Sequence, residues 1–142
     1  MKKVIRIIVA GGFFLFGLIQ LIPFGHNHVN PGVVSEPNWS SPEARVLVKE
    51  HCFQCHSNET EWPWYSNIAP ASWLIQFDVI RGRGKFNFSD WNANPGEVDE
   101  MVGAINEGEM PPIQYWIAHP SSRLTDAQKQ TFIAGLQATL AK

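Results

Sequence analysis

The chain has 142 residues, enough for one domain and a terminal segment, and its 44% hydrophobic content excludes a disordered chain. Lys and Arg number 11 against 13 Asp and Glu, and Lys2, Lys3 and Arg6 all lie at the extreme N-terminus. The remainder is therefore acidic, which argues against nucleic acid as a partner.

The N-terminal 25 residues combine those basic residues with an apolar run. The run covers Ile7–Phe24 and is interrupted only by Gln20 and Pro23. It approaches the ~20 apolar residues that a transmembrane helix needs, and the basic flank would stay in the cytoplasm. The sequence therefore predicts an uncleaved single-pass anchor in the cytoplasmic (inner) membrane, with the rest of the chain on the periplasmic side. A cleaved signal peptide is the alternative, but no small-x-small cleavage site follows the run.

Residues 26–40 are rich in Asn, Pro, Gly and Ser, which predicts a linker. His26 and His28 within it could bind a metal ion, but no third ligand follows, and we expect a solvated pair. Residues 41–142 then form the main domain.

Both cysteines of the chain lie in one motif, Cys52-Phe53-Gln54-Cys55-His56. The pattern C-x-x-C-H is typical of c-type haem attachment. Cys52 and Cys55 would form thioethers with one haem c, and His56 would bind its iron as the proximal ligand. Two other uses remain open. A thioredoxin-like redox pair needs a surrounding βαβ pattern, and a zinc site with His51 and His56 lacks a second ligand pair.

Apolar periodicity and capping residues predict four helices in the main domain. The first begins at the N-cap Ser41, the third ends at Gly108, and the fourth begins with the Thr125–Gln128 capping box. The second should cover 71–81 and end at Gly82. The expected fold class is all-α and cytochrome c-like, with these helices around one haem and the last helix packed across the first.

Met110 is the predicted sixth ligand of the haem iron. It follows the helix-ending Gly108 and precedes two prolines, which would hold its thioether in place. Met101 is the rival methionine, but it lies on the apolar stripe of a predicted helix, where core packing explains it better. His119 is the rival of another residue type.

Arg83 and Trp91 are candidate partners for the haem propionates, because guanidinium and indole N–H groups donate hydrogen bonds to carboxylates. A solvated turn is an equally good interpretation of the Arg83 region.

Several motifs together resemble a known family. They are C-x-x-C-H-S-N-E-T-x-W-P-W-Y-S from Cys52, Asn87-Phe88-Ser89, Gly108-Glu109-Met110-Pro111-Pro112 and His119-Pro120. In these the chain resembles the small membrane-anchored haem-binding domain family of cytochrome c-like proteins, over about Ser41 to Leu140. The resemblance implies a c-type haem protein.

The expected function is electron transfer with a redox partner protein, without catalytic residues. A haem-based gas sensor and a peroxidase-like enzyme, both with a labile sixth ligand, remain alternatives. A peroxidase would need a distal acid–base pair, which the sequence around Met110 does not offer.

Overall fold

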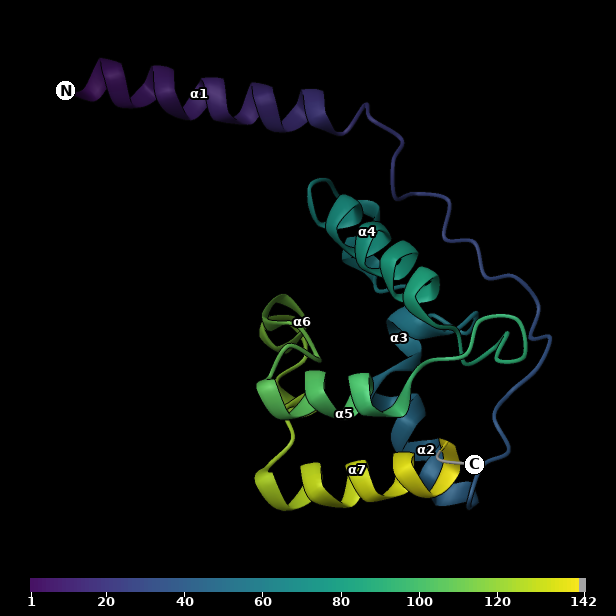
Figure 1. Ribbon diagram of the computed structural model, residues 1–142. Coiled ribbons are helices and arrows are strands. Elements are labelled where there is room, and N and C mark those ends of the chain that lie inside the picture. Colours follow the sequence, from purple (N-terminus) through teal and green to yellow (C-terminus); the bar gives the residue numbers. More distant parts are fainter. Residues whose placement is uncertain (141–142) are drawn as a thin grey trace. The chain divides into compact units, whose positions relative to one another are not determined.

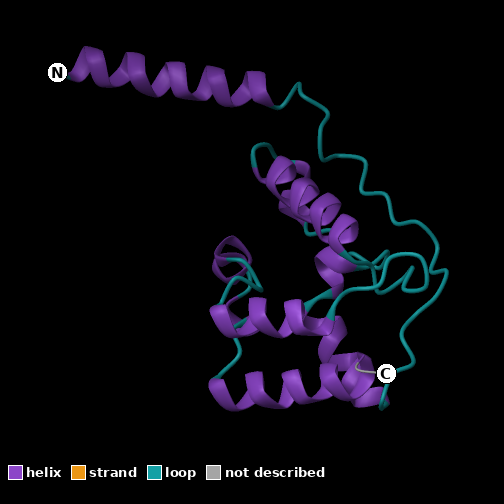
Figure 2. Ribbon diagram, viewed as in Figure 1, coloured by secondary structure: helices purple, strands orange, loops and turns teal. Residues whose placement is uncertain are grey.

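The computed structural model describes residues 1–140, and these are mainly helical (Figures 1 and 2). No strand occurs among them; one isolated β-bridge joins Ser35 and Asp90. Seven α-helices and two 3-10 turns follow in chain order: α1 (Lys2–Ile19), α2 (Pro42–His51), α3 (Phe53–His56), η1 (Trp64–Asn67), α4 (Ala71–Lys85), α5 (Val98–Glu107), α6 (Ile113–Ala118), η2 (Pro120–Ser122) and α7 (Asp126–Leu140).

The predicted N-terminal transmembrane helix is wrong. Helix α1 has 18 residues and begins at Lys2, so all three N-terminal cations lie inside it. Its uncharged part, from Ile7 to Ile19, is shorter than the ~20 residues that span a bilayer. Of the helices in residues 1–140, none is long and apolar enough to cross a membrane. The same finding overturns the predicted location as a single-pass inner-membrane protein.

The described chain divides into two compact units. The first unit comprises Met1–Val29 and Glu61–Asp78, and the second comprises Asn30–Thr60 and the chain from Val79 onward. Helix α4 begins in the first unit and ends in the second.

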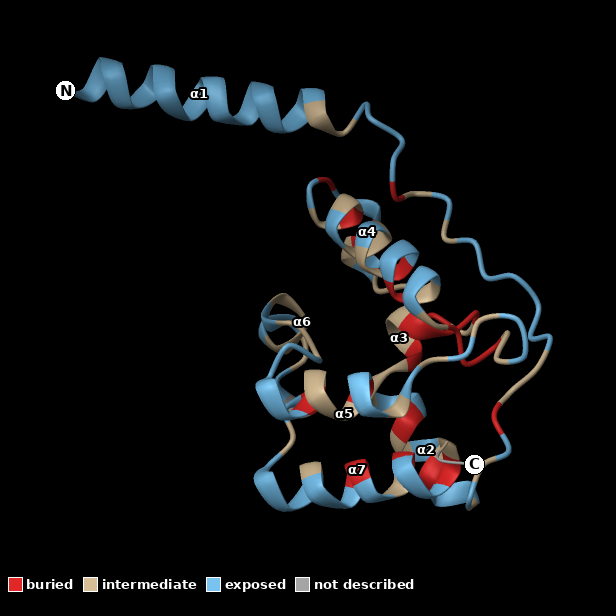
Figure 3. Ribbon diagram, in the orientation of Figure 1, coloured by how far each residue is buried: buried red, intermediate tan, exposed pale blue. Residues whose placement is uncertain are grey.

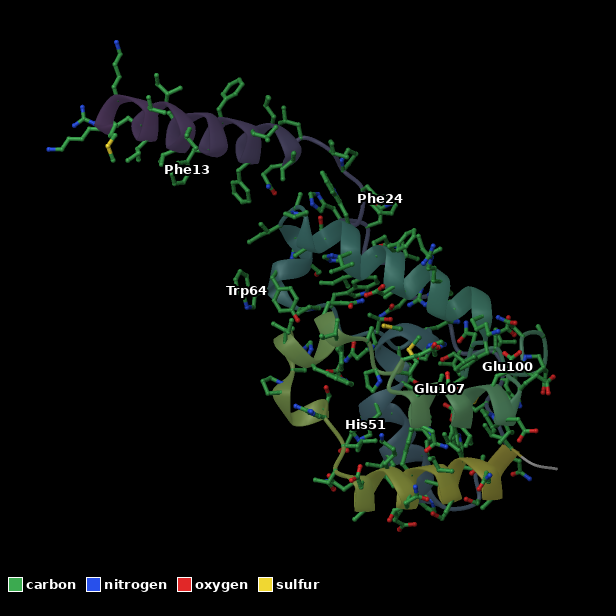
Figure 4. All side chains as sticks on the ribbon, turned by 60° about the vertical axis from the view of Figure 1, so that its left-hand side comes forward. Phe13, Phe24, His51, Trp64, Glu100 and Glu107 are labelled. Atoms are coloured by element: carbon green, nitrogen blue, oxygen red, sulfur yellow. The ribbon has the colours of Figure 1, made fainter. Side chains whose placement is uncertain are left out.

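In the first unit, polar side chains fix the segment that follows α1. The Gln20 amide, which interrupts the apolar run, donates to the Ala69 carbonyl and accepts from the Ala69 N–H, both at 2.9 Å. His28 stacks on Trp62 with ring centroids 4.7 Å apart, and its Nε2 lies 3.1 Å from the Ser66 carbonyl oxygen. Trp64 instead projects into solvent (Figure 4). None of the residues of α1 is buried (Figure 3).

The second unit is organised around α7, which packs against both α2 and α5. The predicted caps are confirmed. The Ser41 hydroxyl accepts from the Ala44 N–H, and Thr125 and Gln128 form the reciprocal bonds of a capping box. The packing of the last helix against α2 is also confirmed. The buried core of the second unit consists of Val48, Phe53, Phe88, Met101, Ile105, Phe132, Ile133 and Leu136.

Replacing Leu136 with alanine should destabilise the second unit strongly. This side chain is 1% exposed in the core, so its truncation leaves a cavity and should cost about 2–5 kcal/mol of unfolding free energy. Chemical denaturation followed by circular dichroism measures the change. Gln137→Ala, at an exposed position of the same helix, is the control; equal stability of the two variants would contradict the packing.

An ion pair fixes the entry to α2. The Arg45 guanidinium donates to both carboxylate oxygens of Glu36, at 2.7 and 2.6 Å, and the Trp39 indole N–H donates to the same carboxylate at 2.6 Å. The hydrogen bond from Arg45 lowers the pKa of Glu36 from its usual value, while partial burial opposes the shift. A charged Glu36 is therefore favoured in the folded state.

This lowered pKa predicts a pH-dependent contribution to stability. The contribution should be complete above the unfolded carboxyl pKa of about 4.3 and should be lost as the pH falls through the lower folded value. Glu36→Gln should therefore be less stable than wild type at pH 7, by up to about 1 kcal/mol, and the difference should shrink below about pH 4. Denaturant unfolding at several pH values tests this, with the exposed Glu107→Gln (Figure 4) as control. A difference that grows on acidification would refute it.

Candidate functional site

The C-x-x-C-H motif forms one compact turn in the second unit. Cys52 ends α2, where its N–H donates to the Val48 carbonyl at 2.8 Å. Its own carbonyl accepts from the N–H groups of Cys55 and His56, at 3.2 and 2.9 Å. Helix α3 thus places the two free thiols and the imidazole within a single turn of helix.

The surroundings of this turn do not match the alternative uses of the cysteines. Burial raises the pKa of Cys52 to about 12, with the Cys55 thiol adding to the shift. The βαβ pattern that a thioredoxin-like pair needs does not occur in residues 1–140, whose named elements are all helical. Within the described part of the chain, no group of three or more His, Cys, Asp or Glu is placed to hold a metal ion. A zinc site with His51 and His56 therefore has no support.

His56 is buried, and both its side chain and its backbone carbonyl make contacts with the segment that follows α4. Its side chain stacks on Phe86 with centroids 3.9 Å apart, and its Nδ1 lies 3.4 Å from the Phe86 carbonyl oxygen. Its backbone carbonyl accepts from the Phe88 N–H at 2.8 Å. Burial lowers the pKa of His56 to about 4, against the raising effect of backbone hydrogen bonds with Phe86 and Gly82. The imidazole is therefore neutral at pH 7, the form that binds metal.

The end of α4 approaches the cysteine turn closely at Gly82. A Cβ at this position would clash with the backbone carbonyl of Cys55. The prediction that Gly82 ends the helix is wrong, because α4 continues to Lys85. The glycine serves close packing rather than termination.

Arg83 lies next to the turn but is engaged by protein groups. Its Nε donates to the Ser57 carbonyl at 2.7 Å, and its Nη2 donates to Asn30 Oδ1 at 2.8 Å and Thr60 Oγ1 at 3.1 Å. Burial lowers the pKa of this guanidinium, while the neighbouring Cys55 raises it. Its predicted role toward a haem propionate stays a prediction.

Trp91, the other propionate candidate, packs against the aromatic core. Its ring stacks on Phe88 with centroids 5.4 Å apart, and its backbone N–H donates to the Ser35 carbonyl at 3.1 Å. Its predicted role toward a propionate likewise stays a prediction.

The two methionines occupy the environments that their sequence positions indicate. Helix α5 ends at Gly108 in the left-handed conformation, with φ of 76°, and Met110 follows with 43% of its surface exposed. Met101 is buried in the core. The assignment of Met110 as sixth ligand stays a prediction.

His119, the rival sixth ligand, and His51, which directly precedes Cys52, are the other two histidines of the second unit. His119 stacks on Tyr115 at 4.4 Å just after α6. His51 (labelled in Figure 4) faces the edge of Phe132 on α7, with centroids 5.5 Å apart, and burial lowers its pKa.

Sequence reasoning assigned no role to a group of buried polar residues beside His56. Ser57, Asn58 and Thr60 follow the motif directly, and Asn87 and Ser89 approach them after α4; all five are buried. In the sequence, this group could have been recognised from the short polar side chains that directly follow C-x-x-C-H.

The residues of the turn fit a haem group. Two thiols and a neutral imidazole provide the donors, and the neighbouring rings of Phe86 and Phe88 provide apolar surface for a porphyrin. A helical domain with such a turn is of the haem-protein class. The model of the family described as haem-binding domain matches residues 14–138, so the chain belongs to that family. No curated protein and no solved structure matches the chain.

Proposed function

We propose that the protein binds one haem c covalently through Cys52 and Cys55, uses His56 as the proximal iron ligand and transfers electrons to or from a partner protein. The observation that carries the proposal is the geometry of the turn, in which both thiols and the imidazole fall within one turn of helix. These are the three residues of the C-x-x-C-H motif.

The chain's own residues would each have a definite task. The two thiols would hold the group through thioether bonds, and His56, next in the chain after Cys55, would bind the iron. With Nδ1 facing the Phe86 carbonyl, the imidazole would bind iron through Nε2. Bound haem would supply an iron that gains or loses one electron between its ferric and ferrous states.

The partner is a redox protein, and its identity follows from no residue of this chain. The acidic balance of the chain outside its N-terminus favours a basic surface on that partner and disfavours nucleic acid.

A haem-stained denaturing gel with a pyridine haemochrome spectrum tests covalent attachment. The protein is expressed together with a cytochrome c maturation system, and we expect haem to remain with the denatured chain and to give the spectrum of two saturated thioether links. A chain that binds haem when folded but releases all of it on denaturation would refute the covalent proposal.

A second candidate function is ligand binding or peroxidase-like chemistry at a labile sixth position. The exposure of Met110 favours it, because a thioether that contacts little protein could leave the iron readily. The coordination number and spin state of the haem iron distinguish the two candidate functions. Six-coordinate low-spin iron in both redox states supports electron transfer, whereas a five-coordinate state supports the second candidate.

A further inference from the structure

The segment that carries the iron-binding imidazole is bonded to a second segment by a buried polar network. The first segment is residues 56–60 and the second is residues 83–89. We call the hydrogen bonds that join the two segments the His56 cradle. The bonds between the segments, beyond those of His56 and Arg83 described above, join Asn87 Nδ2 to Asn58 Oδ1 at 2.9 Å and the Asn58 N–H to Ser89 Oγ at 3.0 Å. All of them lie within the second unit.

Asn87 occupies the central position of the cradle. Its side chain donates to Asn58 on one segment and accepts from the Ser89 N–H, at 2.9 Å, on its own segment. Its two neighbours in sequence are the residues that hold His56. Phe86 supplies the carbonyl facing Nδ1, and the Phe88 N–H binds the His56 carbonyl. Fixing the side chain of Asn87 therefore fixes two of the groups that orient His56, beside the backbone of Gly82.

The burial of these polar groups indicates a geometric purpose. Asn58 and Asn87 are 7% and 8% exposed, and Ser57 and Ser89 are fully buried beside an apolar core. Each hydrogen bond made among such groups adds only modestly to net stability. What a fully bonded network does provide is one defined arrangement of its members.

We propose that Asn87 is a positioning residue for the proximal ligand, which sets the hydrogen bond between His56 Nδ1 and the Phe86 carbonyl and thereby the reduction potential of the haem. The proposal rests on the function proposed above. A shorter bond at Nδ1 gives the imidazole more negative character and stabilises ferric iron. The cradle therefore holds the potential lower than a loosely held imidazole would.

The test compares haem-loaded variants that lose similar hydrogen bonds at different places. Asn87→Ala removes the cradle bond to Asn58 and the bond from the Ser89 N–H, and Ser89→Ala removes only the acceptor for the Asn58 N–H. The control Thr139→Val removes the bonds of a buried threonine to Ser40, 3.0 Å and 3.2 Å long, between α7 and the start of α2. Potentiometric titration, electron paramagnetic resonance of the ferric state and thermal unfolding are measured for each.

We expect Asn87→Ala to raise the potential, with the ferrous-to-ferric equilibrium changed up to about tenfold, or about 59 mV for one electron. The g values should change with it, and Ser89→Ala should change both in the same direction by less. Thr139→Val should lower stability and leave potential and g values unchanged.

Cradle variants that lose stability but keep the wild-type potential and g values would overturn the inference, because a merely structural role predicts that result. If Asn87→Ala does not fold, Ser89→Ala decides by the same measurements. A wild-type protein that binds no covalent haem would instead overturn the proposed function, and this inference with it. If the wild-type protein binds haem covalently but the cradle variants keep its potential and g values, only the inference is overturned.

Discussion

The double variant Cys52→Ala/Cys55→Ala should retain no haem after denaturation and should lose cooperative folding. Its turn would keep the backbone bonds of α3 but lack both anchors. The expectation about folding has a further reason. The loops between the helices are long for a compact domain, and haem would supply core that the side chains alone do not. Haem staining measures the first effect, and circular dichroism during thermal unfolding measures the second.

Two controls separate anchoring from general damage. Each single cysteine variant should retain haem through one thioether link, with a shifted haemochrome band. Thr139→Val keeps the motif intact and should keep full haem staining. A double variant that remains fully helical and unfolds cooperatively would contradict the view that haem completes the core.

The parts of the fold that were predictable depend on local chemistry. The cap at Ser41, the capping box at Thr125 and the left-handed end at Gly108 each need only a few neighbouring residues, and the structure shows all three. The packing of α7 against α2 was expected from the likeness to cytochromes c rather than from local chemistry, and the structure shows it.

The two errors have different causes. The apolar N-terminal run suggested a transmembrane helix, but the three cations lie within α1 and leave a short uncharged stretch. Gly82 resembles a helix terminator in the sequence, yet α4 continues to Lys85, and the glycine is needed because Cys55 lies too close for any side chain. This long-range contact has no signature in the sequence near Gly82.

The candidate site shows the same division. C-x-x-C-H has a fixed local geometry, so the positions of Cys52, Cys55 and His56 follow from the motif alone. The contacts of His56 with Phe86 and Phe88 span about thirty residues, and no periodicity links the two segments. Arg83 was expected near a haem carboxylate from its charge, while its contacts to Ser57 and Thr60 depend on how the two segments meet.

The variant Met110→Ala should abolish the weak near-infrared sulfur-to-iron band expected of a ferric His/Met haem and open the iron to added ligands. Gly108 in its left-handed conformation turns the chain after α5, and the two prolines that follow Met110 reduce the conformational freedom of this segment. The thioether is therefore presented from a stiff segment, which reduces the entropy lost on binding iron. Near-infrared spectra and cyanide or imidazole titrations measure the result.

Met101→Ala is the matched control, because it removes the same side chain from the buried core. It should leave the near-infrared band intact and cost about 2–5 kcal/mol of unfolding free energy, since Met101 is 7% exposed among the packed residues of α5 and α7. An unchanged spectrum in Met110→Ala would reject Met110 as the ligand. His119→Ala would then be the next variant. If the His119 imidazole is the sixth ligand, the spectrum of His119→Ala should change, whereas that of Met110→Ala should not.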